Sequence, residues 1–161
     1  MDSLNKMEST QKLKIEDVLS REGKYVGPTV GISMLPMLKQ RRDTIVVRPK
    51  TEKLKPLDVA LYRRGDAYVL HRVLYTTDTG YVIRGDNCYA DEIVPEEDVF
   101  GVLTEFFSKD KHVLCTDEKY LRYARRRVKN YPFRRFWMRL KQKIKNAVKS
   151  VLKFFGFKRK K

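Results

Sequence analysis

A serine and a histidine in the first half of the chain are the side chains best suited to carry out a reaction. Ser33 lies in the run Gly31-Ile-Ser-Met-Leu-Pro36, where glycine and proline favour a turn that exposes the hydroxyl. His71 is one of only two histidines and lies in the apolar run Tyr68-Val-Leu-His-Arg-Val-Leu74. A serine nucleophile needs a base whose pKa lies near neutral pH, which imidazole supplies. Each residue alone has an ordinary explanation, as a turn serine or a core histidine, but the pair suits hydrolysis.

Three carboxylates follow in the run Arg84-Gly-Asp-Asn-Cys-Tyr-Ala-Asp-Glu92. A carboxylate beside the distal imidazole nitrogen would fix the tautomer of a catalytic histidine. Asp86, Asp91 and Glu92 are all candidates for that role, and the sequence leaves the choice among them open. The alternative explanation is a Gly-Asp-Asn turn that only caps the end of a strand.

The segment that must position these side chains has the pattern of β-strands. Strands are expected at runs rich in β-branched and aromatic residues, which cover 44–48, 59–62, 67–75, 81–84 and 99–107. The runs 64–66 and 78–80 predict tight turns between neighbouring strands. Strand alternation places His71 on one face with Val69 and Val73. Because no βαβ rhythm is present, the predicted fold is mainly β, a compact antiparallel domain.

Helices are predicted at both ends of the β region. Residues 9–22 have helical spacing, with Ser9 or Thr10 as the N-cap and Gly23 as the stop. Residues 133–155 predict one amphipathic basic helix that starts near Pro132. We therefore expect three parts: an N-terminal helical lead-in over 1–24, a catalytic β domain over 25–116 and a basic helical tail over 117–161.

The net charge of +16 is concentrated in the tail. Residues 122–161 hold seventeen Lys or Arg and no Asp or Glu, whereas residues 1–121 carry a net charge of −1. The predicted partner of 122–161 is an anionic membrane surface, which would bind an interfacial helix. Packing of the apolar stripe on the β domain is the second interpretation. Nucleic acid is the third and is disfavoured, because no recognised reader motif is present.

The motifs around Ser33 and His71 resemble the boxes of signal peptidases and LexA-like serine peptidases. The run 31–36 is similar to the nucleophile box Gly-x-Ser-Met-x-Pro of signal peptidases. The remaining family boxes are matched in order by Arg42-Asp-Thr-Ile-Val-Val47, Leu57-Asp-Val-Ala-Leu-Tyr62, His71-Arg-Val73, Gly85-Asp-Asn87 with Asp91-Glu92, and Gly101 in Val99-Phe-Gly-Val102. The resemblance covers residues 25–106. Two positions depart from the family pattern: Arg42 replaces a glycine, and Glu92 stands where an aspartate is usual.

The resemblance implies a serine endopeptidase that cuts a precursor or leader peptide. Histidine rather than lysine at position 71 is similar to the endoplasmic-reticulum and archaeal branch, which uses a Ser–His pair with a supporting acid. Ser33 would be the nucleophile and His71 the base, supported by Asp86, Asp91 or Glu92. The oxyanion would be bound by backbone N–H groups of the turn at Gly31, Ser33 and Met34, foremost that of Ser33.

Two other functions remain as rivals: a LexA-like regulator that cleaves itself, and a catalytically silent binding module with the same fold. The former is disfavoured because the residues before the β region are too few for a helix-turn-helix. No cofactor and no metal site are predicted, since Cys88 and Cys115 lack zinc-ligand spacing and suggest no disulfide framework. Neither a signal peptide nor a membrane-spanning run is recognisable, so we expect a cytoplasmic protein that associates peripherally with a membrane.

Overall fold

A computed structural model of the chain describes residues 14–154, with side chains as far as Leu152. The chain divides into two compact units, Met1–Asp117 and Glu118–Lys161. The described part of the first unit is mainly β, and the described part of the second unit is helical. The predicted fold class, an antiparallel β domain with a short N-terminal helix and helical structure at the C-terminal end, is thereby confirmed.

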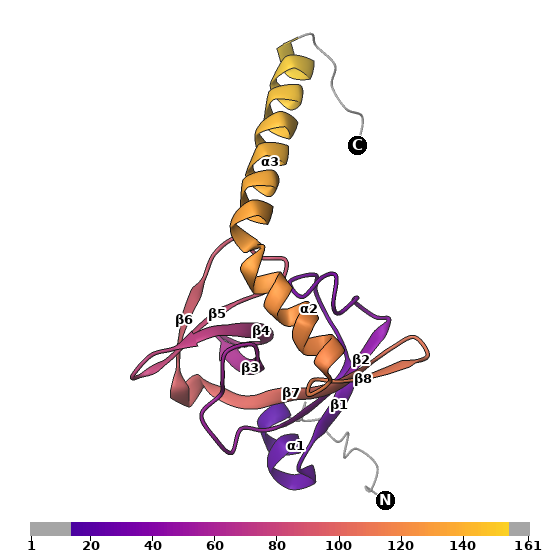
Figure 1. The fold of residues 1–161 in the computed structure, drawn as a ribbon, viewed down its shortest axis with the longest axis vertical. Coiled ribbons are helices and arrows are strands. Elements are labelled where there is room, and N and C mark those ends of the chain that lie inside the picture. Colours follow the sequence, from indigo (N-terminus) through magenta and orange to yellow (C-terminus); the bar gives the residue numbers. More distant parts are fainter. Residues whose placement is uncertain (1–13, 155–161) are drawn as a thin grey trace, which may run out of the picture. The chain divides into compact units, whose positions relative to one another are not determined.

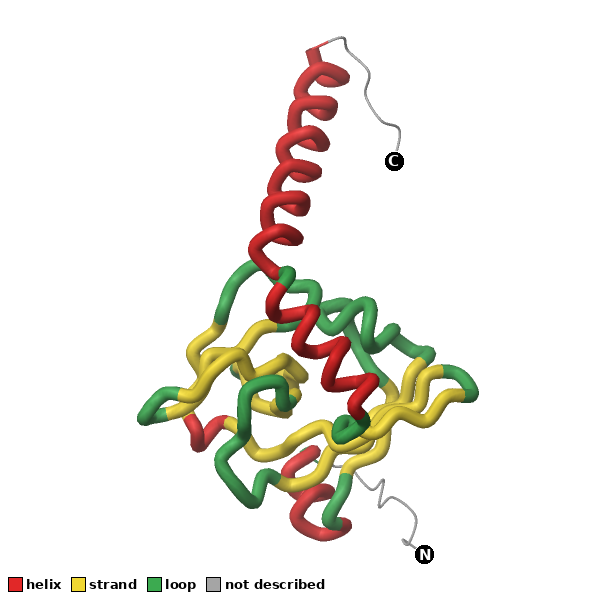
Figure 2. The backbone as a smooth tube through the Cα atoms, in the orientation of Figure 1, coloured by secondary structure: helices red, strands yellow, loops and turns green. Residues whose placement is uncertain are grey.

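Eight strands form one antiparallel sheet in the first unit (Figure 1). Their order is β1-β2-β7-β3-β4-β5-β6, and β8 pairs with β7 beside this path. The sheet curls strongly instead of lying flat (Figure 2). The strand bounds are β1 Tyr25–Pro28, β2 Asp43–Pro49, β3 Val59–Arg64, β4 Ala67–Thr76, β5 Gly80–Arg84, β6 Glu92–Pro95, β7 Val99–Ser108 and β8 Lys111–Leu114. A 3-10 turn, η1 (Glu96–Asp98), joins β6 to β7.

The five strands expected from the sequence correspond to β2, β3, β4, β5 and β7. The short strands β1, β6 and β8 have no counterpart among the predicted runs. Each has four residues, and β6 buries only Val94 while Ile93 is 80% exposed. So short a strand at the rim of a sheet leaves no periodic pattern to detect.

Helix α1 (Ile15–Glu22) begins after Lys14, whose backbone is extended, and ends at Gly23. Gly23 has φ +67°, the left-handed conformation that glycine adopts freely, so the predicted stop is confirmed. The predicted cap at Ser9 or Thr10 is wrong for this helix, and those two residues lie outside the described part of the chain. Leu19 packs toward Gly101, where a β-carbon would lie 3.3 Å from its Cδ1.

The hairpin of β3 and β4 fixes the position of His71. Gly65 has φ +60° in the tight turn, and the register that follows pairs Ala60 with His71 and Tyr62 with Val69. Tyr62 and His71 therefore point to the same face of the sheet. Tyr62 belongs to a core of buried hydrophobic side chains on this face. Its other members are Leu54, Ala60, Val69, Val73, Tyr81, Ile83, Val94 and Val99. His71 lies in this layer with 2% of its surface exposed.

The second unit contains two helices, α2 (Glu118–Lys129) and α3 (Tyr131–Phe154). The single predicted helix over 133–155 thus starts two residues earlier and follows a separate helix; Phe155 lies outside the described residues. The break falls at Asn130 because Pro132 has no N–H to donate to a preceding carbonyl and is tolerated only in a first turn. None of the helices in 14–154 is long and apolar enough to cross a membrane.

Candidate active site

The loop that carries Ser33 is closed at its base by hydrogen bonds. Thr29 Oγ1 donates to the carbonyl of Lys39 over 2.9 Å, and the N–H of Lys39 donates to Asp43 Oδ2 over 2.8 Å. Arg42 donates to both carboxylate oxygens of Asp43 and to Ser108 Oγ. Asp43 is 1% exposed, so Arg42 neutralises a buried charge.

The Gly85-Asp86-Asn87 turn fastens this loop from the other side. The N–H of Asn87 donates to the Ser33 carbonyl over 2.7 Å, and Asn87 Nδ2 donates to the Ile32 carbonyl over 3.2 Å. The N–H of Asp86 lies 3.5 Å from Met34 Sδ. The Gly85-Asp86-Asn87 turn, whose carboxylate was a predicted partner of His71, therefore positions the backbone of Ser33.

The Ser33 carbonyl oxygen and His71 Nε2 both lie close to the position that a β-carbon would take at Gly85. A β-carbon at Gly85 would lie 2.8 Å from the Ser33 carbonyl oxygen and 2.9 Å from His71 Nε2. Only glycine fits here, because both distances are shorter than a β-carbon contact in real structures. The serine loop and the imidazole ring thus meet across one residue without a side chain.

Ser33 Oγ makes no hydrogen bond within the described part of the chain. The side-chain atom found beside His71 Nε2 is Cys88 Sγ, at 3.9 Å. Catalytic serine–histidine hydrogen bonds are often long without substrate and tighten when it binds. The geometry therefore brings Ser33 and His71 into one site without joining them directly.

The opposite ring nitrogen of His71 is held by two oxygens. Its Nδ1 lies 3.0 Å from Tyr62 Oη and 3.1 Å from Glu92 Oε1. Tyr62 has a single hydroxyl proton, which it donates to Glu92 Oε2 over 2.8 Å. Both oxygens near Nδ1 can then only accept from it, so Nδ1 carries the ring proton in the neutral form. The lone pair lies on Nε2, which faces Gly85 and the serine loop.

The environment keeps His71 neutral and Tyr62 protonated near neutral pH. Burial lowers the pKa of His71 below its usual value, and the negative charge of Glu92 opposes this effect without cancelling it. Burial and the neighbouring Glu92 carboxylate raise the pKa of the Tyr62 hydroxyl well above its usual value. A neutral imidazole is the form that can accept a proton.

The three predicted carboxylates have different partners. Asp86 forms a buried ion pair with Arg72, with Nη2–Oδ2 and Nε–Oδ1 distances of 2.8 and 2.9 Å. Asp91 pairs with Arg84 over 2.7 Å. Glu92 is the one of the three that contacts His71. The sequence alone left this choice open.

The turn offers backbone donors for an oxyanion. Gly31 has φ +89°, the chain bends at 31–32, and residues 33–37 form consecutive turns. Among the described residues, no acceptor is found for the N–H of Ser33 or Met34, whereas the N–H of Leu35 donates to the Ile32 carbonyl. The three predicted oxyanion residues therefore lie within four consecutive positions of one loop, whose backbone N–H groups are candidates to bind an oxyanion.

Two residues at this site were not predicted, Tyr62 and Cys88. Tyr62 could have been found, because a two-residue turn after Arg64 sets the register that places it on the face of His71. Cys88 carries no such signal, since its approach to Nε2 depends on the irregular turn after Gly85. No cluster of three His, Cys, Asp or Glu side chains that could hold a metal ion is present in residues 14–152.

Comparison of the chain with protein-family profiles, with curated protein sequences and with solved structures gives no significant match.

Proposed function

We propose that the protein is a serine endopeptidase of signal-peptidase type, with Ser33 as nucleophile, His71 as general base and Glu92 as the supporting acid. The observation that carries the proposal is the two-sided environment of His71. Its Nδ1 is held by Glu92 and Tyr62, and its Nε2 faces the loop that carries Ser33. A structural core histidine has no need of a carboxylate and a hydroxyl at one ring nitrogen while the other lies beside the backbone of a partly exposed loop.

The proposed reaction is acyl transfer in two steps. Ser33 Oγ attacks the scissile carbonyl carbon while its proton passes to His71 Nε2. The imidazolium then gives this proton to the leaving amine as the carbon–nitrogen bond breaks, which leaves an ester on Ser33. Water attacks the ester, its proton passes to His71, and the serine hydroxyl is restored as the acid product leaves.

Glu92 and Tyr62 have distinct parts in this scheme. The Glu92 carboxylate stabilises the positive charge that His71 gains in each step, because it lies 3.1 Å from Nδ1. Tyr62 bridges the two groups and limits how the ring can rotate. The N–H groups of Ser33 and Met34 would bind the oxyanion of each tetrahedral intermediate.

Cys88 is the second candidate nucleophile, because its sulfur lies 3.9 Å from Nε2. Burial and the negative charge of Glu92 raise the pKa of this thiol above its usual value. Cysteine nucleophiles in enzymes depend on the opposite shift, toward the thiolate. Ser33 is favoured for this reason and because its turn is accessible from solvent.

A peptide substrate in extended conformation suits the position of the serine loop. β1 is the last strand of the sheet on its side and leads through Thr29 into this loop. A peptide that pairs with the edge of β1 that no other described strand covers would gain backbone hydrogen bonds and run toward Ser33. A precursor or leader peptide cut within an unstructured segment would meet this requirement.

The test is cleavage of a diverse synthetic peptide pool, read by mass spectrometry, with the purified wild type, His71→Ala and the matched control His112→Ala. His112 is the other histidine and lies on β8, where it pairs with Glu105. We expect His71→Ala to lose about a thousandfold or more in rate and His112→Ala to keep the wild-type rate. If the wild type cleaves no peptide, the silent binding module is the better account. If its own mass falls during incubation, a self-cleaving regulator is.

A further inference from the structure

Helix α3 exposes a continuous row of large apolar side chains. Seven of them are between 46% and 67% exposed, and we call them the apolar stripe: Phe133, Phe136, Trp137, Ile144, Val148, Val151 and Leu152. With about 100° of rotation per residue, all seven fall within one side of the helix. Phe133 and Phe136 each meet the ring of Trp137 edge-on, with centroids 6.1 Å apart. Such a row exposed to water marks a surface that binds something apolar.

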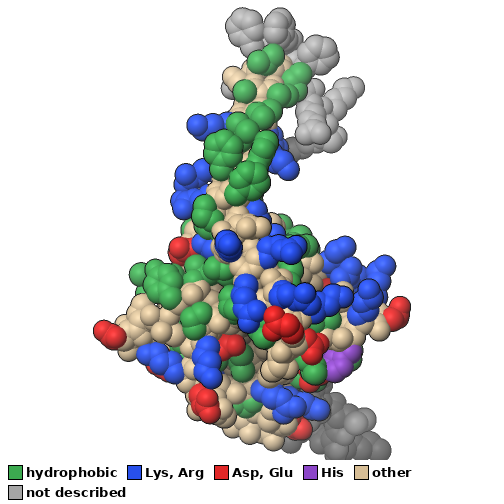
Figure 3. All heavy atoms as spheres, in the orientation of Figure 1, with side chains coloured by type: hydrophobic (Ala, Val, Ile, Leu, Met, Phe, Trp, Pro, Cys, Tyr) green, Lys and Arg blue, Asp and Glu red, His purple; other side chains and the backbone are tan. Residues whose placement is uncertain are grey.

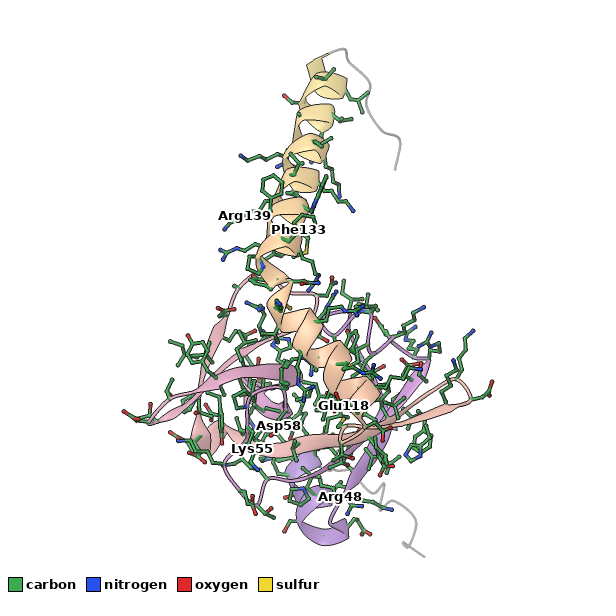
Figure 4. The ribbon with its side chains drawn as sticks, in the orientation of Figure 1. Arg48, Lys55, Asp58, Glu118, Phe133 and Arg139 are labelled. Atoms are coloured by element: carbon green, nitrogen blue, oxygen red, sulfur yellow. The ribbon has the colours of Figure 1, made fainter. Side chains whose placement is uncertain are left out.

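Basic side chains border the stripe on both sides. At about 100° per residue, Lys141 and Lys145 fall along one border and Lys143 falls along the other, whereas Arg139 lies nearer the opposite side. Figure 3 shows the green row on α3 with blue side chains on either side of it. Phe133 and Arg139 both project from the first half of the helix (Figure 4).

Basic side chains also lie on the side opposite the stripe, among them Arg135, Arg139 and Lys149. Gln142 lies about 180° from the centre of the stripe and donates a hydrogen bond to Asn146 over 3.1 Å. Cations at the borders, with apolar groups between them, are what a helix lying flat in a lipid interface requires, since long basic side chains reach back to the headgroups.

We infer that α3 is a membrane-surface anchor that binds anionic phospholipid, with the apolar stripe in the acyl boundary and the bordering Lys and Arg on the headgroups. α3 has eight Lys or Arg and no acidic residue. A second copy of this helix is a poor occupant of the stripe, because pairing would bring two sets of positive charges together. The inference does not depend on the peptidase activity.

The fluorescence of Trp137 can report the binding of α3 to lipid. Trp137 is the chain's only tryptophan and lies 46% exposed within the stripe. Transfer of the indole from water to the interface shifts its fluorescence emission to shorter wavelength, and lipids with brominated chains quench it. Tryptophan also favours the headgroup level of a bilayer.

The experiment mixes the full-length protein with vesicles of phosphatidylcholine alone or of phosphatidylcholine with phosphatidylglycerol, and measures flotation and Trp137 emission. We expect binding, a blue shift and quenching with the anionic vesicles, weakened by added salt, and little with the neutral ones. The double variant Lys143→Gln/Lys145→Gln, which removes one cation from each border of the stripe, should bind about thirtyfold more weakly.

A variant of the stripe and a matched control separate lipid insertion from charge attraction. Ile144→Ser/Val148→Ser should lose at least about tenfold in binding, whereas Gln142→Ser/Asn146→Ser on the opposite side should bind as the wild type does. Circular dichroism checks that each variant stays helical. Equal binding to neutral vesicles, or no binding to either kind, would overturn the inference. So would self-association or binding to an oligonucleotide without vesicle binding.

Discussion

His71 Nδ1 lies 3.1 Å from Glu92 Oε1, and Tyr62 donates its hydroxyl proton to the other oxygen of the same carboxylate. The strand β4 supplies the imidazole, β3 the phenol and the start of β6 the carboxylate. Three separate strands thus fix one tautomer of one ring. The consequence is a histidine whose free nitrogen faces the serine loop across Gly85.

Replacing Glu92 should reduce turnover without unfolding the protein. Glu92→Gln keeps the size of the side chain but removes the charge that stabilises the imidazolium, so we expect kcat to fall by at least about a hundredfold. The neighbouring Asp91→Asn is the matched control, because Asp91 pairs with Arg84 and its side chain is 48% exposed. Steady-state kinetics on a cleaved peptide distinguish the two. Equal losses in both variants would remove Glu92 from the proposed triad.

The buried ion pair between Arg72 and Asp86 should contribute to stability and not directly to chemistry. Their side chains are 1% and 3% exposed, so Asp86→Asn leaves a guanidinium buried with its charge uncompensated. We expect the free energy of unfolding to fall by about 3–5 kcal/mol. Asp91→Asn, at a partly exposed ion pair, should change it by less than about 1 kcal/mol. Denaturation by urea measures both, and a similar small change in both variants would contradict this role for Asp86.

The positions of these residues could be predicted from the sequence to different depths. The strands β2 to β5 and β7 have β-branched runs, and the Gly65 turn fixes the register of Tyr62 against His71. The choice among the three carboxylates could not be predicted, because it depends on how the irregular segment 85–91 folds. The burial of Arg72 could not be predicted from the run of residues around it, because its charge is paired by Asp86, which lies in a distant turn.

Stability and activity should both depend on pH through His71. Burial lowers its pKa in the folded protein, whereas the unfolded chain has the ordinary value of about 6.5. Between the folded pKa and about 6.5 the unfolded chain therefore binds more protons, so the free energy of unfolding falls as the pH drops through this window. Above it, the contribution is fully present. The slope contributed by one group is at most about 1.4 kcal/mol per pH unit.

Urea denaturation across this pH range, with His71→Gln and the control His112→Gln, isolates the effect. The His71 variant should lose the slope in the window, and the His112 variant should keep it. The acid limb of kcat/KM in the wild type should lie below pH 6.5 as well, because only the neutral ring accepts a proton. Identical slopes in all three proteins would show that His71 is not the group that titrates.

Alkylation of Cys88 should block the site although the thiol takes no part in the reaction. Its sulfur lies 3.9 Å from His71 Nε2, so an added carboxamidomethyl group would occupy the space between imidazole and serine. We expect iodoacetamide to abolish cleavage in the wild type and in Cys115→Ala. Cys88→Ala should resist the reagent and stay within about tenfold of the wild-type kcat/KM. Loss of all activity in Cys88→Ala would favour the thiol as nucleophile.

The most direct test of the central claim is the kcat/KM of Ser33→Ala on a peptide that the wild type cleaves, with Ser20→Ala as control. Ser20 is an exposed serine of α1 and has no place in the site. The account predicts that Ser33→Ala loses about 10³-fold or more while Ser20→Ala is unchanged. Cleavage by Ser33→Ala at the wild-type rate would contradict the assignment of Ser33 as nucleophile.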